Sequence, residues 1–140
     1  MRSKRLMALS MSLFAWVGLM AATAEAGVLA FRLQPMNPAI EVDGLVKMTK
    51  TGGTERLDLR VFTGELKEGT MLHVSIVRDG ASEPVEIARI KLVLGSALLQ
   101  MDSRKDVSPL FPFKGVTEFI VWAPGRGNLA HGSVPGTSAQ

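Results

Sequence analysis

Two histidines, His73 and His131, are the side chains of this sequence best suited to metal chemistry. Met71 stands two residues before His73, so both side chains share one face if this segment is a strand. A thioether favours Cu(I) and an imidazole binds copper in either oxidation state, which makes Met71, His73 and His131 a candidate copper or zinc site. The alternative is an ordinary exposed strand histidine. Because Met-x-His is such a short pattern, we favour this alternative and expect no metal and no cofactor.

The remaining reactive side chains are scattered along the chain. Asp102 and Asp106 flank a short charged run, and two carboxylates are able to serve as general acid and base. Arg104 and Lys105 in the same run nearly cancel their charge, which is typical of a solvated loop. The sequence contains no nucleophile elbow, no zinc-protease signature and no phosphate-binding glycine loop. We therefore predict no catalytic residues and no enzymatic activity, with a small secreted hydrolase as the remaining alternative.

The segment from Ser108 to Gly115 bears on binding rather than catalysis. Two prolines stiffen it in an extended form. Its three large apolar residues are Leu110, Phe111 and Phe113. These side chains either tuck under the segment as a core plug, which we favour, or remain exposed. Contiguous exposed aromatic residues mark contact sites, so the three residues are also our candidates for contact with an unidentified protein or envelope component.

The first 26 residues have the three-part layout of a secretory signal peptide. Three basic residues precede an apolar run from Leu6 to Met20, and Ala24-Glu25-Ala26 forms an A-x-A cleavage site. An uncleaved membrane anchor is the alternative, because the segment from Leu6 to Ala24 is long enough to cross a bilayer of about 30 Å. We expect cleavage after Ala26 and export to the periplasm or the extracellular space. The mature chain is then not stably inserted in a membrane.

Cleavage of the signal peptide lowers the net positive charge of the chain. Three of the 16 basic residues and one of the 13 acidic residues lie in the signal peptide, which leaves 13 against 12. The basic pI of about 9.6 therefore does not indicate a nucleic-acid partner. No cysteine is present, so apolar burial and backbone hydrogen bonds must hold the exported domain. We expect one domain over residues 27–134 and a disordered tail over 135–140.

Two glycine-centred turns organise the rest of the chain. Gly52 and Gly53 suit the central positions of a type I′ hairpin turn, where both residues need positive φ. Gly95-Ser96 has the form of a type II′ turn, which predicts a second hairpin. The first turn sets Met48 against Leu57, Val46 against Leu59, Lys47 against Asp58 and Thr49 against Arg56. The second sets Leu94 against Ala97, Leu92 against Leu99, Ile90 against Met101 and Arg89 against Asp102.

Further strands are expected around these two hairpins. The apolar residues of the segment 85–94 change from odd to even positions, which predicts a bulge near Ala88 and Arg89. The segment that starts at Thr117 is apolar on both faces, so we expect a central strand with Trp122 in the core. About seven or eight short strands with regularly spaced turns predict an all-β fold. We favour an antiparallel two-sheet sandwich over a small barrel.

A corner of the form G-x-L-x-x-G-T spans Gly64 to Thr70, between one strand and the next. Together with the glycine turn at 95 and the Asp-Ser at 102–103, it resembles a pattern in uncharacterised exported bacterial β-sandwich domains. The resemblance covers roughly residues 54–134 and implies an immunoglobulin-like sandwich without catalytic residues. The sequence thus predicts an exported binding or structural domain. The fold alone does not specify its partner.

Overall fold

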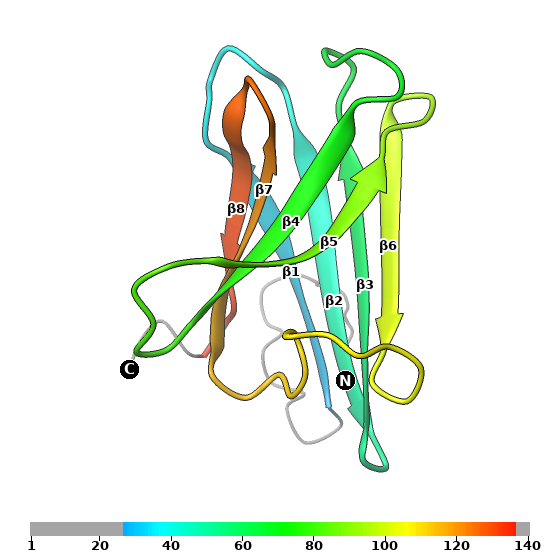
Figure 1. The fold of residues 1–140 in the computed structure, drawn as a ribbon, viewed down its shortest axis with the longest axis vertical. Helices are drawn as coiled ribbons and strands as arrows, with labels where there is room; N and C mark the ends of the chain where they lie inside the picture. The colour runs from blue at the N-terminus through cyan, green and yellow to red at the C-terminus, as the bar shows by residue number, and fades with distance from the viewer. Residues whose placement is uncertain (1–26, 137–140) are drawn as a thin grey trace, which may run out of the picture.

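The computed structural model describes residues 27–136, which form eight strands and no helix (Figure 1). The strands are β1 (Val28–Pro35), β2 (Asp43–Thr51), β3 (Thr54–Phe62), β4 (Met71–Arg78), β5 (Val85–Lys91), β6 (Ser96–Asp102), β7 (Val116–Ala123) and β8 (Gly127–Ser133). The predicted all-β fold is therefore confirmed. Over the described range, no helix is available that would be long and apolar enough to cross a membrane. The predicted signal peptide and residues 137–140 of the predicted tail lie outside the described residues.

The strands follow one another in a single hydrogen-bonded order, β5-β4-β7-β8-β1-β2-β3-β6, and all neighbours are antiparallel. Strand β1 pairs with β2 from Val28 to Leu33 but with β8 only at Gln34 and Pro35. It thereby joins the two halves of the sheet. The result is a nearly barrel-shaped sheet rather than the clear two-sheet sandwich that we predicted (Figure 1).

Two glycines beside β1 permit this curvature. A Cβ atom on Gly44 would lie 2.5 Å from Leu33 Cδ1, and one on Gly132 would lie 2.9 Å from the Arg32 carbonyl oxygen. The Leu33 side chain fills the space that these glycines leave and is itself 2% exposed. The sheet can therefore bend closely at β1 without opening a void in the core. Alternation of apolar residues predicts which side chains point inward, but it does not predict this bend.

The first predicted hairpin is confirmed. Gly52 and Gly53 have φ angles of 55° and 84°, as a type I′ turn requires. The register of β2 and β3 is the expected one, with Met48 opposite Leu57 and Lys47 opposite Asp58. The apolar members of the pairs are buried, so the two glycines fix the register and the apolar face together.

The second predicted hairpin is wrong. The turn is centred on Leu94 and Gly95, with φ angles of 52° and 80°, and only Val93 and Ser96 pair across it. After this turn the two strands separate. Strand β5 pairs with β4, whereas β6 pairs with β3 and sets Leu99 against Leu59.

The physical reason is that an alternating apolar strand fits any neighbour with a matching face. Strand β3 offers β6 seven paired positions, which include an ion pair of Arg56 Nε and Asp102 Oδ2 at 3.8 Å in place of the expected Arg89. Strands β5 and β6 consequently lie at the two ends of the strand order. The Val93–Ser96 turn holds these two edges close at one end of the barrel (Figure 1).

The predicted bulge and central strand are both confirmed. Val74 lies opposite Ala88 and Ser75 opposite Glu86, so Ile87 is the additional residue of a bulge in β5. Strand β7 lies between β4 and β8 and contributes Phe119 to the core.

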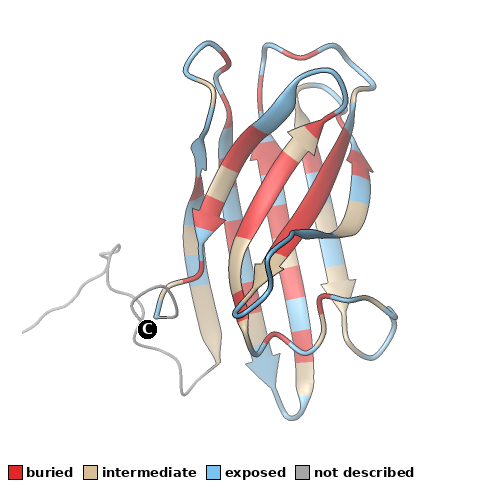
Figure 2. Ribbon diagram, turned by 60° about the vertical axis from the view of Figure 1, so that its left-hand side comes forward, coloured by how far each residue is buried: buried red, intermediate tan, exposed pale blue. Residues whose placement is uncertain are grey.

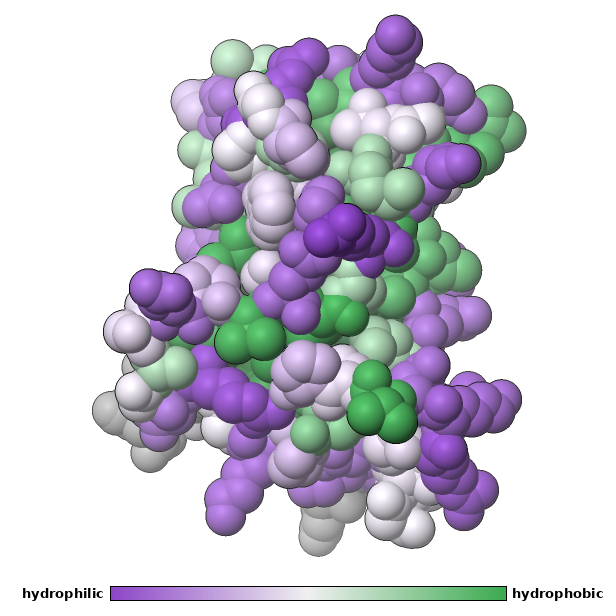
Figure 3. All heavy atoms as spheres, in the orientation of Figure 1, coloured by the Kyte–Doolittle hydropathy of each residue, from purple (hydrophilic) through white to green (hydrophobic). Residues whose placement is uncertain are grey.

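Inward side chains from both halves of the sheet form one core, visible as alternating buried and exposed bands along the strands (Figure 2). Its largest fully buried side chains are Phe119, Leu57, Leu59, Leu72, Ile76, Leu92, Leu110 and Leu129. Apolar residues also reach the surface near the turn between β5 and β6, on the upper right of Figure 3. The main ones are Phe62, Val93, Leu94 and Leu98.

Candidate functional site

The loop between β6 and β7 closes the barrel at the end opposite the Val93–Ser96 turn (Figure 1). Leu110 and Phe113 are 0% and 9% exposed, and Phe111 is half-buried against the same core. The rings of Phe111 and Phe113 lie 5.5 Å apart. Leu110, Phe111 and Phe113 are therefore a core plug, which we favoured, and they do not form an exposed contact surface. The partner-contact reading of these residues is corrected accordingly.

Arg78, the last residue of β4, holds this loop in place. Its guanidinium group donates hydrogen bonds to four loop carbonyl groups. The acceptors are Lys114 O at 2.7 Å, Pro109 O at 2.6 Å, Leu110 O at 3.0 Å and Pro112 O at 2.8 Å. Backbone carbonyl groups near a core need such donors, and guanidinium supplies five N–H groups in a fixed planar arrangement. The loop is thus tied to the end of β4.

Glu55 holds the opposite side of the loop. The residue is 8% exposed, and its Oε1 accepts a hydrogen bond of 2.9 Å from the Phe113 N–H group. Its Oε2 lies 3.7 Å from Lys50 Nζ. The Glu55 N–H group donates to Ser103 Oγ at 2.9 Å, which fixes the start of the same loop. A buried carboxylate requires partners of this kind, so Glu55 couples β3 to the loop.

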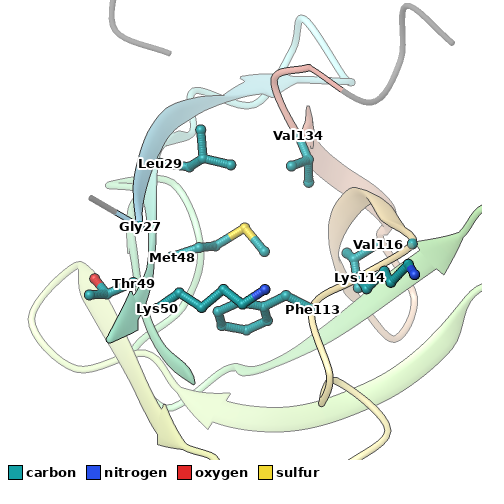
Figure 4. A pocket seen from close by; sticks show the side chains of 10 residues that line it. Gly27, Leu29, Met48, Thr49, Lys50, Phe113, Lys114, Val116 and Val134 are labelled. Carbon is teal, nitrogen blue, oxygen red and sulfur yellow. The ribbon is translucent and has the colours of Figure 1, made fainter. Parts of the chain in front are cut away.

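A pocket of about 360 Å³ lies beside Phe113, between the loop, the starts of β1 and β7, and the end of β2 (Figure 4). It has the size and apolar character of small-molecule sites, which occur in the mouths of β-barrels. Its apolar side chains are Leu29, Met48, Phe113, Val116 and Val134. Its remaining lining residues are Gly27, Thr49, Lys50, Lys114 and Gly115.

Positively charged side chains predominate around this pocket. Among the described residues, Lys50 and Lys114 are its two charged lining residues, and none of the lining residues is acidic. Lys50 has Glu55 as its ion-pair partner, whereas within residues 27–136 no ion pair involves Lys114. In Figure 4 the Lys50 side chain extends beside the Phe113 ring, below Met48, and Lys114 lies beside Val116 at the margin. The pocket therefore combines apolar walls with a positively charged rim.

The structure does not bring the three candidate metal ligands together. Strand β7 separates His73 on β4 from His131 on β8, which corresponds to about 9 to 10 Å between the two outer strands. Their Nδ1 atoms face different carboxylates, since His73 lies 3.2 Å from Glu86 Oε1 and His131 lies 2.9 Å from Glu118 Oε2. Met71 is 39% exposed at the start of β4. Among the described residues, no cluster of three or more His, Cys, Asp or Glu side chains has a metal-binding arrangement.

His73 is buried, so our expectation of an exposed strand histidine is wrong. Its ring lies 4.1 Å from that of Trp122 and is 7% exposed. Trp122 in turn lies on the outer face of β7, half-buried, and its Nε1–H donates to Ser75 Oγ at 3.1 Å. The expectation that Trp122 belongs to the core is therefore also wrong. The inward alternation of Phe119, Val121 and Ala123 was a signal that Trp122 points outward.

Glu86 stabilises the same outer face. The Arg89 Nε–H group donates to Glu86 Oε2 at 2.6 Å, and His73 faces the other oxygen. The hydrogen bond from Arg89, followed by that from His73, lowers the pKa of Glu86 below its ordinary value, because both favour the ionised carboxylate. His73 is thus part of an interaction cluster that joins β4, β5 and β7.

The two aspartates of the charged run also have structural partners. Asp106 Oδ2 accepts a hydrogen bond from the Asp102 N–H group at 2.8 Å, and Asp102 Oδ1 accepts one from the Arg104 N–H group at 2.8 Å. These bonds form the turn after β6. The arrangement agrees with a loop rather than with an acid and base pair.

The sequence did not reveal the pocket. Phe113 was singled out, but as a contact or plug residue, and Met48 was interpreted only as a strand position paired with Leu57. These residues are far apart in the chain and meet only because β1, β2, the loop and the end of β8 converge at one barrel end. The lone signal was the alternation that turns Met48 inward.

Comparison with known proteins does not assign a function to this pocket. No family model matches the chain, and no curated protein and no solved structure matches it either. The function is therefore inferred from the pocket and its surroundings.

Proposed function

We propose that the chain is an exported, non-enzymatic binding protein that holds a small apolar molecule in the pocket beside Phe113. The observation that carries this proposal is an opening of about 360 Å³ with five apolar side chains in its wall. Export, to the periplasm or beyond, rests on the N-terminal signal pattern. The relation to exported immunoglobulin-like sandwich domains rests on the corner at residues 64–70 and remains a prediction.

The anchoring of the loop supports binding to a pocket that exists before the ligand arrives. Arg78 makes four hydrogen bonds to the loop, and Glu55 fixes it from the opposite strand. A wall that is already ordered loses little conformational entropy when a ligand binds. An apolar ligand would gain affinity mainly by leaving water.

The partners of the reactive side chains support binding rather than catalysis. His73 and His131 each face a carboxylate on the outside of the barrel, away from the pocket. The Ser75 hydroxyl accepts the indole N–H bond and is 4% exposed, which leaves little access for a substrate. Among the described residues, the ionisable residues that line the pocket are two lysines, Lys50 and Lys114.

Binding of the neutral fluorescent probe N-phenyl-1-naphthylamine tests the proposal. We expect saturable fluorescence enhancement at one probe per chain. Leu29→Trp should abolish it, because Leu29 points into the pocket (Figure 4), whereas the matched exposed substitution Leu98→Trp should not. Thermal melting establishes that both variants are folded. Absence of saturable binding, or equal binding by folded Leu29→Trp and Leu98→Trp, would refute the proposal.

A further inference from the structure

We infer that the ligand is an amphipathic anion, with an apolar chain of about eight to ten carbons in the pocket and one anionic head group at the rim. This inference rests on the proposed function, because it assigns a ligand class to the same pocket. It concerns two properties that the apolar wall alone does not determine. They are the charge of the head group and the length of the chain.

The sign of the head group follows from the charges at the rim. Lys50 and Lys114 line the pocket, and none of its lining residues within 27–136 is acidic. Glu55 approaches only Lys50, at 3.7 Å, and its other oxygen is occupied by the Phe113 N–H group. One ammonium charge is thus partly compensated, and the second has no ion-pair partner within the described range.

Arg78 adds positive charge behind the same rim. Its guanidinium group donates to the carbonyl oxygen of Lys114 at 2.7 Å, so it lies next to the residue that carries the uncompensated ammonium group. A carboxylate at the rim would be attracted by Lys50 and Lys114, and more weakly by Arg78 behind them. The one anion nearby is Glu55, whose charge is partly compensated by Lys50. A cationic head group would meet repulsion from the same groups.

The length of the chain follows from the volume. At the roughly 30 Å³ that a water molecule occupies in the liquid, a space of about 360 Å³ holds about twelve heavy atoms. Decanoate has that number of heavy atoms. The flexible Met48 side chain in the wall, 5% exposed, allows chains of slightly different shape to pack.

Displacement of N-phenyl-1-naphthylamine by three ligands with the same chain tests the inference. These are decanoate, decanol and decyltrimethylammonium. The unmodified protein should bind decanoate more tightly than decanol, and decyltrimethylammonium least tightly. The advantage of decanoate over decanol should be about two- to fivefold for an exposed ion pair, and it should decrease in high salt.

Lys114→Gln should remove most of that advantage, so that decanoate and decanol displace the probe about equally well. The matched control is Lys67→Gln, which makes the same charge change at an exposed residue of the corner loop between β3 and β4, at the other end of the barrel (Figure 1). Lys114→Glu should reverse the preference, so that decyltrimethylammonium binds more tightly than decanoate. A misfolded variant would not produce such a reversal.

The outcomes separate the inference from the proposed function. Equal displacement by all three ligands, unaffected by either Lys114 substitution, would overturn the anionic ligand and leave the apolar pocket intact. Failure of the probe itself to bind the unmodified protein would overturn both. Tighter binding of tetradecanoate than of decanoate would overturn the chain length.

Discussion

The loop that closes the barrel should depend on Arg78 more than on any other polar side chain. Arg78→Met keeps most of the apolar stem and removes four hydrogen bonds to loop carbonyl groups. The bond to Leu110 O is partly buried and should contribute about 1.5 to 3 kcal/mol as a bond to a charged donor. The other three acceptors are exposed, and water can replace the lost donor, so we assign about 0.5 kcal/mol to each.

The free energy of unfolding should therefore decrease by about 3 to 4.5 kcal/mol in Arg78→Met. Arg78→Lys should lie between this variant and the unmodified protein, because an ammonium group retains the charge but not the planar set of donors. Urea denaturation followed by the fluorescence of Trp122 measures both values. Arg126→Met, in the exposed turn before β8, is the control and should change stability by less than about 0.5 kcal/mol.

The Arg78→Met substitution should also loosen the loop between β6 and β7 itself. Amide hydrogen exchange of the Phe113 N–H group, which donates to Glu55, should accelerate in Arg78→Met more than exchange in β2 and β3 does. A loss of less than about 0.5 kcal/mol, together with unchanged exchange at Phe113, would refute the assignment of Arg78 as the anchor of the loop.

Three further predictions concern single residues. Phe113→Ala should lower the free energy of unfolding by about 3 kcal/mol or more, because Phe113 is a buried plug residue. An unchanged midpoint of urea denaturation would instead favour the interpretation that this loop contacts a partner. The pKa of Glu86 is lowered in the folded state, so its stabilising effect is present above the unfolded value near 4.3 and is lost as the pH falls through the folded pKa. Acid titrations should accordingly give a smaller loss of stability for Glu86→Gln than for the unmodified protein, and parallel curves would contradict the interactions of Glu86 with Arg89 and His73. Gly53→Ala, at a φ of 84°, should destabilise the first hairpin by about 1 to 2 kcal/mol. Gly64→Ala, where φ is ordinary, is the control and should be tolerated. Equal melting temperatures of the two variants in calorimetry would argue against the type I′ turn.

Local rules predicted much of the fold. The positive φ angles of Gly52 and Gly53 and the matching of Met48 with Leu57 follow from neighbouring residues alone, and the structure contains both. The bulge at Ile87 was likewise visible as a change of parity. Such features involve residues that are close in the chain, where turn chemistry and side-chain alternation act directly.

Features that depend on distant strands were not predicted. Strand β6 pairs with β3 instead of β5, because an apolar face does not specify its partner. The near closure of the barrel depends on Leu33 packing over glycines of two other strands. The pocket could not be predicted without the strand pairing and the barrel closure, because its wall forms where strands remote in sequence meet.

The methyl resonances of methionine provide the most direct test of the pocket. Met48 lines it and is 5% exposed, whereas Met36 and Met71 are 44% and 39% exposed elsewhere. On titration with N-phenyl-1-naphthylamine, the ring current of the bound probe should shift the Met48 methyl signal with saturation, while the Met36 and Met71 signals remain in place. Saturable probe binding that shifts Met36 or Met71 and leaves Met48 unchanged would contradict binding in the barrel mouth.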